Sequence, residues 1–198
     1  MGMMIKLSSI IFFLLTSIIL MSAQTLSYDV KALGMKVGSM KITRTASGSN
    51  ILYQIESTNH VSYLFGEIDV KHSSSASFLN GVLQKSNSKT DKNGKLESSC
   101  ETVLSGSVYK IKTHQTTAVY SSPIRYSIFS MYYNEPKGLK EIFSEEYGKM
   151  VPINEVKPHR FMVSFPDGKK YHYDFENGVI SDVEVPSAVG TVHMRLKK

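Results

Sequence analysis

The chain has 198 residues, a formal net charge of +6, no tryptophan, and a single cysteine, Cys100. One cysteine cannot form an internal disulfide, which excludes a disulfide-stapled scaffold, so stability must come from a hydrophobic core. The length is sufficient for one such core and favours a single domain.

Residues 1–23 have the pattern of a secretory signal peptide. Lys6 is the only charged side chain before the apolar run 7–21, and the small residues Ser22 and Ala23 follow it. We therefore expect cleavage after Ala23 or Gln24. A retained single-span anchor is the alternative, but the run falls short of the roughly 20 residues of a span and no Lys or Arg cluster follows it.

This leader predicts an exported bacterial protein, periplasmic or secreted, that does not span the membrane once processed. Export excludes nucleic acid as the partner of the positive charge. The remaining explanations are solubility or weak attraction to anionic envelope surfaces, and we favour solubility.

Residues 24–198 are predicted to form one all-β domain. Alternation places Tyr28 and Val30 on one face of a strand and Asp29 and Lys31 on the other. About eleven such runs predict antiparallel strands with one apolar and one solvated face. Because little helix is available to cover the apolar face, we expect a strongly curved meander that forms a barrel or half-barrel. A sandwich would give similar signals.

Four dipeptides predict tight hairpin turns, because asparagine, aspartate and glycine tolerate the positive φ angles of type I′ turns. They are Asn80-Gly81, Asn93-Gly94, Asp167-Gly168 and Asn177-Gly178.

The stretch RYSIFSMYYNEPKG lies in the only segment that favours a helix. Pro123 follows two serines, and Ile124, Ile128, Met131 and Tyr132 repeat at helical spacing. We predict one helix over residues 123–133, with its apolar face across the open side of the sheet.

The sequence predicts no cofactor, no metal site and no catalytic site. It contains none of the common hydrolase, zinc-protease or nucleotide-binding motifs, and its six histidines show no paired spacing. Glu67 and Asp69 share a strand face, but Lys71 continues that face, which favours a solvated exterior. His172 and Asp174 are interpreted in the same way.

Aromatic residues are the remaining candidates for function. A wide curved sheet encloses more volume than side chains readily fill, so its tyrosine-rich interior could form a pocket for an apolar or amphipathic molecule. Plain packing is the alternative. The candidate ligand-lining residues are Tyr53, Tyr63, Ile128, Tyr132, Phe161, Tyr171 and Tyr173.

Three segments, YYNEPKGLKEIFSEEYG, FPDGKKYHYDFENGVISDVEV and GTVHMRL, are similar to exported bacterial β-rich proteins known only as a domain of unknown function. The resemblance covers most of the chain after the leader. It implies an envelope location and a curved antiparallel sheet, and it carries no established functional residues.

These observations lead to three hypotheses. The first is an exported noncatalytic protein that holds an apolar or amphipathic ligand, such as a hydrophobic small molecule or lipid, inside a curved sheet. The second is an interaction or assembly module for another envelope protein. The third is a hydrolase of envelope polymers, which would need a cleft where acids or histidines converge.

Overall fold

The computed structural model describes residues 21–63, 66–187 and 190–198, apart from the side chain of Tyr63. They form one antiparallel sheet of fourteen strands and one short helix, α1, so the predicted all-β class is confirmed. The predicted count of about eleven strands is wrong. Two of the strands have only four residues each, which is too short to show alternation, and one of these buries three successive residues.

The first eight strands form the N-terminal half of the sheet. They are β1 (Met21–Ala32), β2 (Met35–Ser47), β3 (Asn50–Tyr63), β4 (Gly66–Leu79), β5 (Val82–Lys92), β6 (Lys95–Ser105), β7 (Val108–Thr113) and β8 (Thr117–Tyr120). After α1 (Ile128–Met131), the C-terminal half comprises β9 (Glu141–Ser144), β10 (Lys149–Lys157), β11 (Arg160–Ser164), β12 (Lys170–Glu176), β13 (Val179–Ser187) and β14 (Gly190–Leu196).

The two halves are meanders joined through the first and last strands. The strand order runs from β8 down to β1, and then from β14 down to β9. β1 pairs with β14 from Tyr28 opposite Leu196 to Ala32 opposite Val192. The domain therefore begins and ends in the middle of its own sheet.

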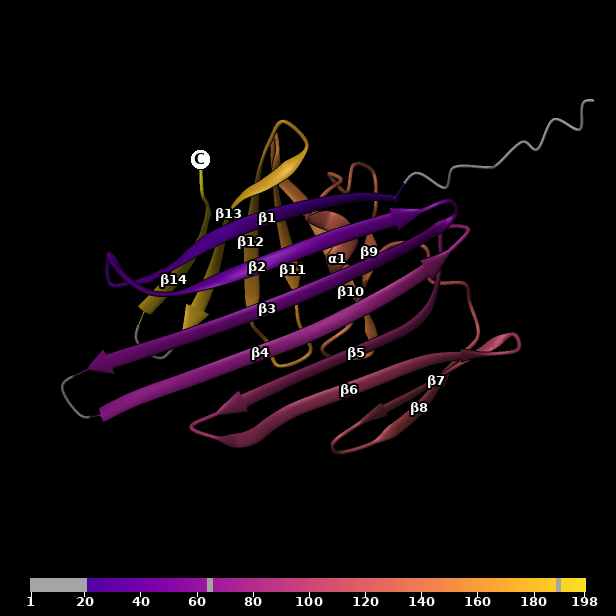
Figure 1. The fold of residues 1–198 in the computed structure, drawn as a ribbon, viewed down its shortest axis with the longest axis horizontal. Coiled ribbons are helices and arrows are strands. Elements are labelled where there is room, and N and C mark those ends of the chain that lie inside the picture. The colour runs from indigo at the N-terminus through magenta and orange to yellow at the C-terminus, as the bar shows by residue number, and fades with distance from the viewer. Residues whose placement is uncertain (1–20, 64–65, 188–189) are drawn as a thin grey trace, which may run out of the picture.

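The sheet folds back on itself without closing. In Figure 1, β1–β6 cross the front of the molecule, while β10–β13 run steeply behind them. β8 and β9 are the two ends of the described sheet, so of the two predicted forms, barrel and half-barrel, the closed barrel is wrong. The predicted curvature and meander order are present.

Three of the four predicted type I′ turns are confirmed. Both central residues have positive φ at Asn80-Gly81, Asn93-Gly94 and Asn177-Gly178. At Asp167-Gly168 only the glycine does, because the connection is a longer loop in which the Phe165 N–H donates to the Lys169 carbonyl oxygen.

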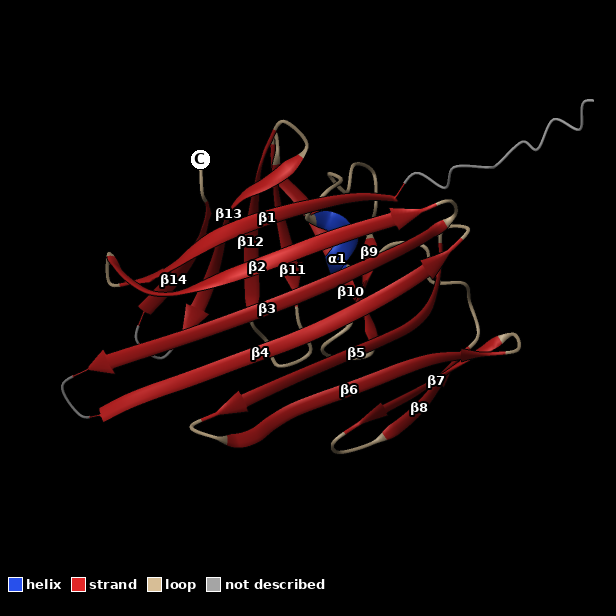
Figure 2. Cartoon of the chain, in the orientation of Figure 1, coloured by secondary structure: helices blue, strands red, loops and turns tan. Residues whose placement is uncertain are grey.

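The predicted helix over residues 123–133 is mostly wrong, since α1 contains only four of those residues (Figure 2). Long-range bonds hold the preceding residues in a non-helical segment. The Leu83 N–H donates to the Ile124 carbonyl oxygen, and the Ile124 N–H donates to the Tyr109 hydroxyl. Ser127 immediately precedes the helix and forms an isolated β-bridge with Phe143.

The core lies between the two halves, and α1 lies within it. Phe129 packs near Tyr53 of β3, and the Tyr132 ring meets the Tyr28 ring edge to face at 5.7 Å. Cys100 is 1% exposed and belongs to the same core.

The predicted signal peptide, 1–23, lies outside the described residues except for Met21, Ser22 and Ala23, which begin β1. Within the described ranges, no helix has the length and apolar character that a membrane span requires.

Candidate functional site

An inner cavity of about 270 Å³ lies between the two halves of the sheet. The inner faces of β2–β5 form one wall. The other wall comes from α1, the turn after β9, and β12–β14. The cavity therefore exists only because the sheet folds back on itself.

A polar band on β4 and β5 forms part of the first wall. His72 lies opposite Thr90 in the strand register, and Ser74 lies opposite Ser88. The His72 Nδ1 atom is 3.0 Å from the Thr90 hydroxyl, and the Ser74 hydroxyl donates to the Asn87 carbonyl oxygen at 2.8 Å. Burial lowers the pKa of His72, so its imidazole is neutral at pH 7.

Glu145 lines the opposite wall and is only 2% exposed. Within the described part of the chain, neither carboxylate oxygen makes a hydrogen bond of normal geometry. Burial raises the pKa of the carboxyl to about 7, against smaller lowering effects from the nearby Ser127 hydroxyl and the N–H groups of Ile128 and Phe129. A buried carboxyl without a well-aligned donor is costly, so it points to a missing partner.

The four-residue turn 145–148 between β9 and β10 positions this carboxyl. Gly148 closes the turn with φ of +61°, and its N–H donates to the Ser144 carbonyl oxygen at 2.8 Å. A Cβ at Gly148 would lie 2.5 Å from Ile111 Cγ2 and 2.9 Å from Cys100 Sγ. Glycine therefore lets the turn sit directly against β6 and β7.

Glu146, the next residue of the turn, also lines the inner cavity, but it is exposed. Its surroundings raise the pKa of its carboxyl, mainly through burial. Solvent reaches Glu146, so Glu145 is the carboxyl that the protein encloses.

A second, outer cavity of about 330 Å³ adjoins the first. Asn59, Val70, Val185 and Met194 line both. The other apolar residues of the outer cavity are mostly half-buried; they are Val30, Val37, Val61, Ile68 and Val192. Lys92 and Glu97 also line it, and they form an ion pair at 3.6 Å. The two cavities therefore combine an apolar outer section with a partly polar inner one.

Four of the seven predicted ligand-lining residues line the inner cavity: Ile128, Tyr132, Tyr171 and Tyr173. Tyr53 and Phe161 are buried in the core and line neither of the two cavities. The side chain of Tyr63 lies outside the described part of the structure. Contact with a ligand stays a prediction for all seven.

Sequence reasoning missed His72, Glu145 and Glu146. A usable signal was present in HSSSASF, where polar residues occupy the inward positions of β4 as well as the outward ones. Glu145 gave no such signal, because it lies in a turn. The acids that the sequence did single out, Glu67 and Asp69, are exposed as predicted.

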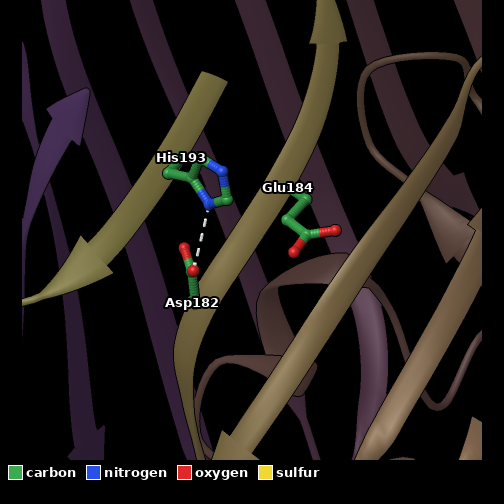
Figure 3. A group of neighbouring side chains, drawn as sticks. All are labelled: Asp182, Glu184 and His193. Carbon is green, nitrogen blue, oxygen red and sulfur yellow. Dashed lines mark hydrogen bonds and ion pairs between the residues drawn. The ribbon is translucent and has the colours of Figure 1, made fainter. Parts of the chain in front are cut away.

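A second polar cluster lies on the outer face of the C-terminal half. The ligand atoms of Asp182, Glu184 and His193 all lie within 4.8 Å of one another and could hold a metal ion (Figure 3). The grouping arises because Asp182 and Glu184 are two residues apart on β13, which places both side chains on the same face, and because His193 lies opposite Glu184 on β14.

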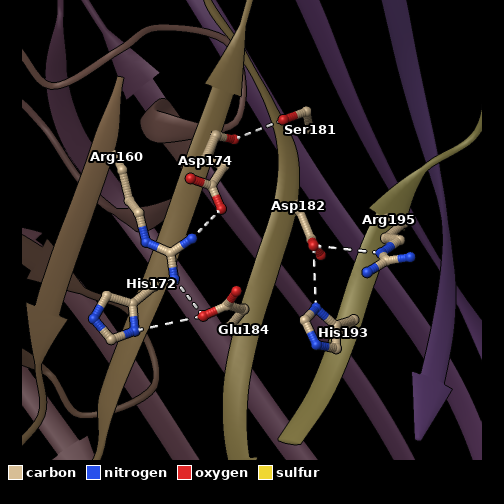
Figure 4. A network of polar contacts seen from close by, with 8 residues as sticks. All are labelled: Arg160, His172, Asp174, Ser181, Asp182, Glu184, His193 and Arg195. Atoms are coloured by element: carbon tan, nitrogen blue, oxygen red, sulfur yellow. Dashed lines mark hydrogen bonds and ion pairs between the residues drawn. The ribbon is translucent and has the colours of Figure 1, made fainter. Parts of the chain in front are cut away.

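Two arginines already neutralise these carboxylates (Figure 4). Arg160 donates to Asp174 at 2.7 Å and also to Glu184, while Arg195 Nε lies 3.4 Å from Asp182. A metal ion would have to compete with both guanidinium groups. The cluster is therefore best described as an ion-pair ladder that ties β11–β14 together.

Of the comparisons with known proteins, only the one with family models gave a match. No curated protein and no solved structure matches it. One family model matches residues 28–197, which includes both cavities and the outer ladder. The chain therefore belongs to the family described as "Domain of unknown function (DUF6134)".

Proposed function

We propose that this protein is an exported, noncatalytic binding protein of a bacterial envelope that holds an amphipathic small molecule between the two halves of its sheet. The observation that carries the proposal is the division of the two adjoining cavities. The outer one is mainly apolar, and the inner one carries Glu145 and the polar band of β4 and β5.

This division favours binding over plain packing. An ordinary core favours apolar residues at inward positions such as those of His72, Ser74 and Ser88, because every buried polar group needs a hydrogen-bond partner of its own. Each cavity is close to the lower end of the range for ligand pockets, about 300–1,000 Å³. Together they suit a molecule with an apolar tail and a polar head.

Hydrolysis of an envelope polymer is the alternative that the inner cavity brings forward, because His72, Glu145 and Glu146 all line it. Two observations argue against it. The inner cavity, at about 270 Å³, is too small to take a polymer strand unless the two halves separated. The nearby thiol of Cys100 is a poor nucleophile, since burial raises its pKa.

The test is native mass spectrometry on protein purified gently from the cells that produce it, followed by solvent extraction of the bound molecule. We expect an adduct of small mass that survives purification. Val192→Trp, which fills the outer cavity, should abolish the adduct. Val119→Trp is the matched control, because Val119 is 69% exposed on β8, away from both cavities.

A protein that carries no adduct, and that binds none of a panel of twelve-carbon amphiphiles, would overturn the proposal. An adduct retained equally by both tryptophan variants would place the bound molecule elsewhere and would also contradict it.

A further inference from the structure

We propose that the bound amphiphile carries a positively charged nitrogen head group, a primary ammonium, which the Glu145 carboxylate holds in the inner cavity. This inference rests on the proposed function and adds the chemical class of the ligand. Three features of the cavity walls support it.

The first feature is charge. Glu145 and Glu146 line the inner cavity, and no lysine or arginine is among its described lining residues. His72 is neutral, and Lys92 of the outer cavity is paired with Glu97. Above pH 7, where the Glu145 carboxyl is ionised, a fatty acid or phosphate head group would meet uncompensated negative charge here, whereas a cation would neutralise it.

The second feature is hydrogen-bonding capacity. Both oxygens of Glu145 are acceptors that lack an aligned donor in the described structure. The hydroxyls of Ser88 and Thr90 line the same cavity and can accept as well. A primary ammonium brings three N–H donors and no acceptor, so it complements a wall of this kind.

The third feature is the aromatic lining. Among the described residues, five aromatic ones line the inner cavity, namely Phe129, Tyr132, Phe165, Tyr171 and Tyr173. Aromatic rings attract cations through their electron-rich faces and also pack against methylene groups. The alkyl tail would continue past Val70 and Val185 into the outer cavity.

A purely structural role for Glu145 is the competing explanation. Its carboxyl lies near the Ser127 hydroxyl and the first N–H groups of α1, so it could serve only to hold that segment. The two roles differ in one measurable respect. A structural carboxyl affects stability but does not affect the choice between ligands of different charge.

The experiment compares dodecylammonium, dodecanol and dodecanoate, each below its micellar concentration, by isothermal titration calorimetry with the purified protein. Because one charge-assisted hydrogen bond changes affinity about tenfold or more, we expect dodecylammonium to bind at least about tenfold more tightly than the other two. Glu145→Gln should remove that preference and leave dodecanol binding within about twofold of the wild type.

Glu101→Gln is the matched control, because the half-exposed carboxylate of Glu101 on β6 lines neither cavity, so its loss should leave all three affinities unchanged. If Glu145→Gln fails to fold, the ligand series with the wild-type protein alone decides the question.

Two failures are distinguishable. If dodecanol or dodecanoate binds as tightly as the amine, or if Glu145→Gln keeps the preference for the amine, the charged head group is wrong and the proposed function stands. If none of the three binds, the proposed function itself fails.

Discussion

The Tyr28 hydroxyl donates a hydrogen bond of 2.9 Å to the carbonyl oxygen of Ile180, across the core and 152 residues along the chain. Both residues are fully buried. This bond links β1 to β13 beyond the strand that lies between them in the sheet, and it therefore fixes how far the two halves fold toward each other.

We expect Tyr28→Phe to lower the free energy of unfolding by about 1–2 kcal/mol, because the change leaves a buried carbonyl oxygen without this donor. Urea denaturation followed by circular dichroism measures the loss. Tyr147→Phe is the comparison, since its hydroxyl bonds to the partly exposed Asp167 and should matter less. Equal effects of the two substitutions would contradict a special role for the Tyr28 bond.

Gly148→Ala should be markedly destabilising. The turn requires positive φ at this position, which alanine disfavours, and the new Cβ would also collide with Ile111 and Cys100. Gly106→Ala tests the backbone alone, since Gly106 has φ of +65° with nothing within 4 Å of a built Cβ. We expect about 1 kcal/mol for Gly106→Ala and about 1–3 kcal/mol more for Gly148→Ala. Thermal unfolding of the two variants side by side measures the difference, and a similar loss in both would show that the turn has room to move.

Glu145 should make stability depend on pH. Its pKa is raised from 4.5 to about 7 in the folded protein, so the folded state binds the proton more tightly than the unfolded chain does. The resulting stabilisation is complete below pH 4.5 and is lost as the pH rises to about 7. Glu145→Gln keeps the group neutral, so its stability relative to the wild type should increase by on the order of 3 kcal/mol over that range and then level off.

Urea unfolding of both proteins from about pH 4.5 to about pH 8.5 measures this difference, and subtracting the curves removes the titration of groups common to both. The Glu101→Gln variant should show no comparable rise, because Lys85 lowers the pKa of Glu101. A constant difference between Glu145→Gln and the wild type would mean that the carboxyl ionises normally in the fold.

Arg160→Met tests the outer ladder. The side chain of Arg160 is 19% exposed and bonds to both Asp174 and Glu184, so its loss leaves two neighbouring carboxylates unneutralised. We expect a loss of about 1–2 kcal/mol that shrinks at high salt. Lys85→Met breaks the well-exposed pair with Glu101 and should cost less than about 0.5 kcal/mol. Chemical denaturation at low and high salt distinguishes the two pairs.

The sequence predicted the strands well, because alternation along a strand directly reflects which face is buried. Tyr28 and Val30 lie inside, and Asp29 lies on the other face with its carboxylate paired to Lys36. The asparagine-glycine turns were equally clear, since few residues tolerate positive φ. The helix was overpredicted because the bonds that hold Ile124 outside the helix come from β5 and β7, and local spacing cannot reveal them.

Only part of the inner site could be predicted from the sequence. Its aromatic residues could be proposed from composition, and Tyr171 and Tyr173 do line the cavity. His72 and Glu145 could not be connected, because they lie on different meanders and meet only when the sheet folds back. A turn residue such as Glu145 also has no periodic pattern that would show which way its side chain faces.

The pairing of β1 with β14 has a consequence for how the molecule is made. The hairpins of the N-terminal meander can form before the C-terminal half is available. The edge of Tyr28–Ala32, however, gains its second neighbouring strand only when residues 192–196 are present. Until then the chain presents an open strand edge of the kind that aggregates. We therefore expect the incomplete chain to be more prone to aggregation than the finished sheet, which hides that edge at its centre.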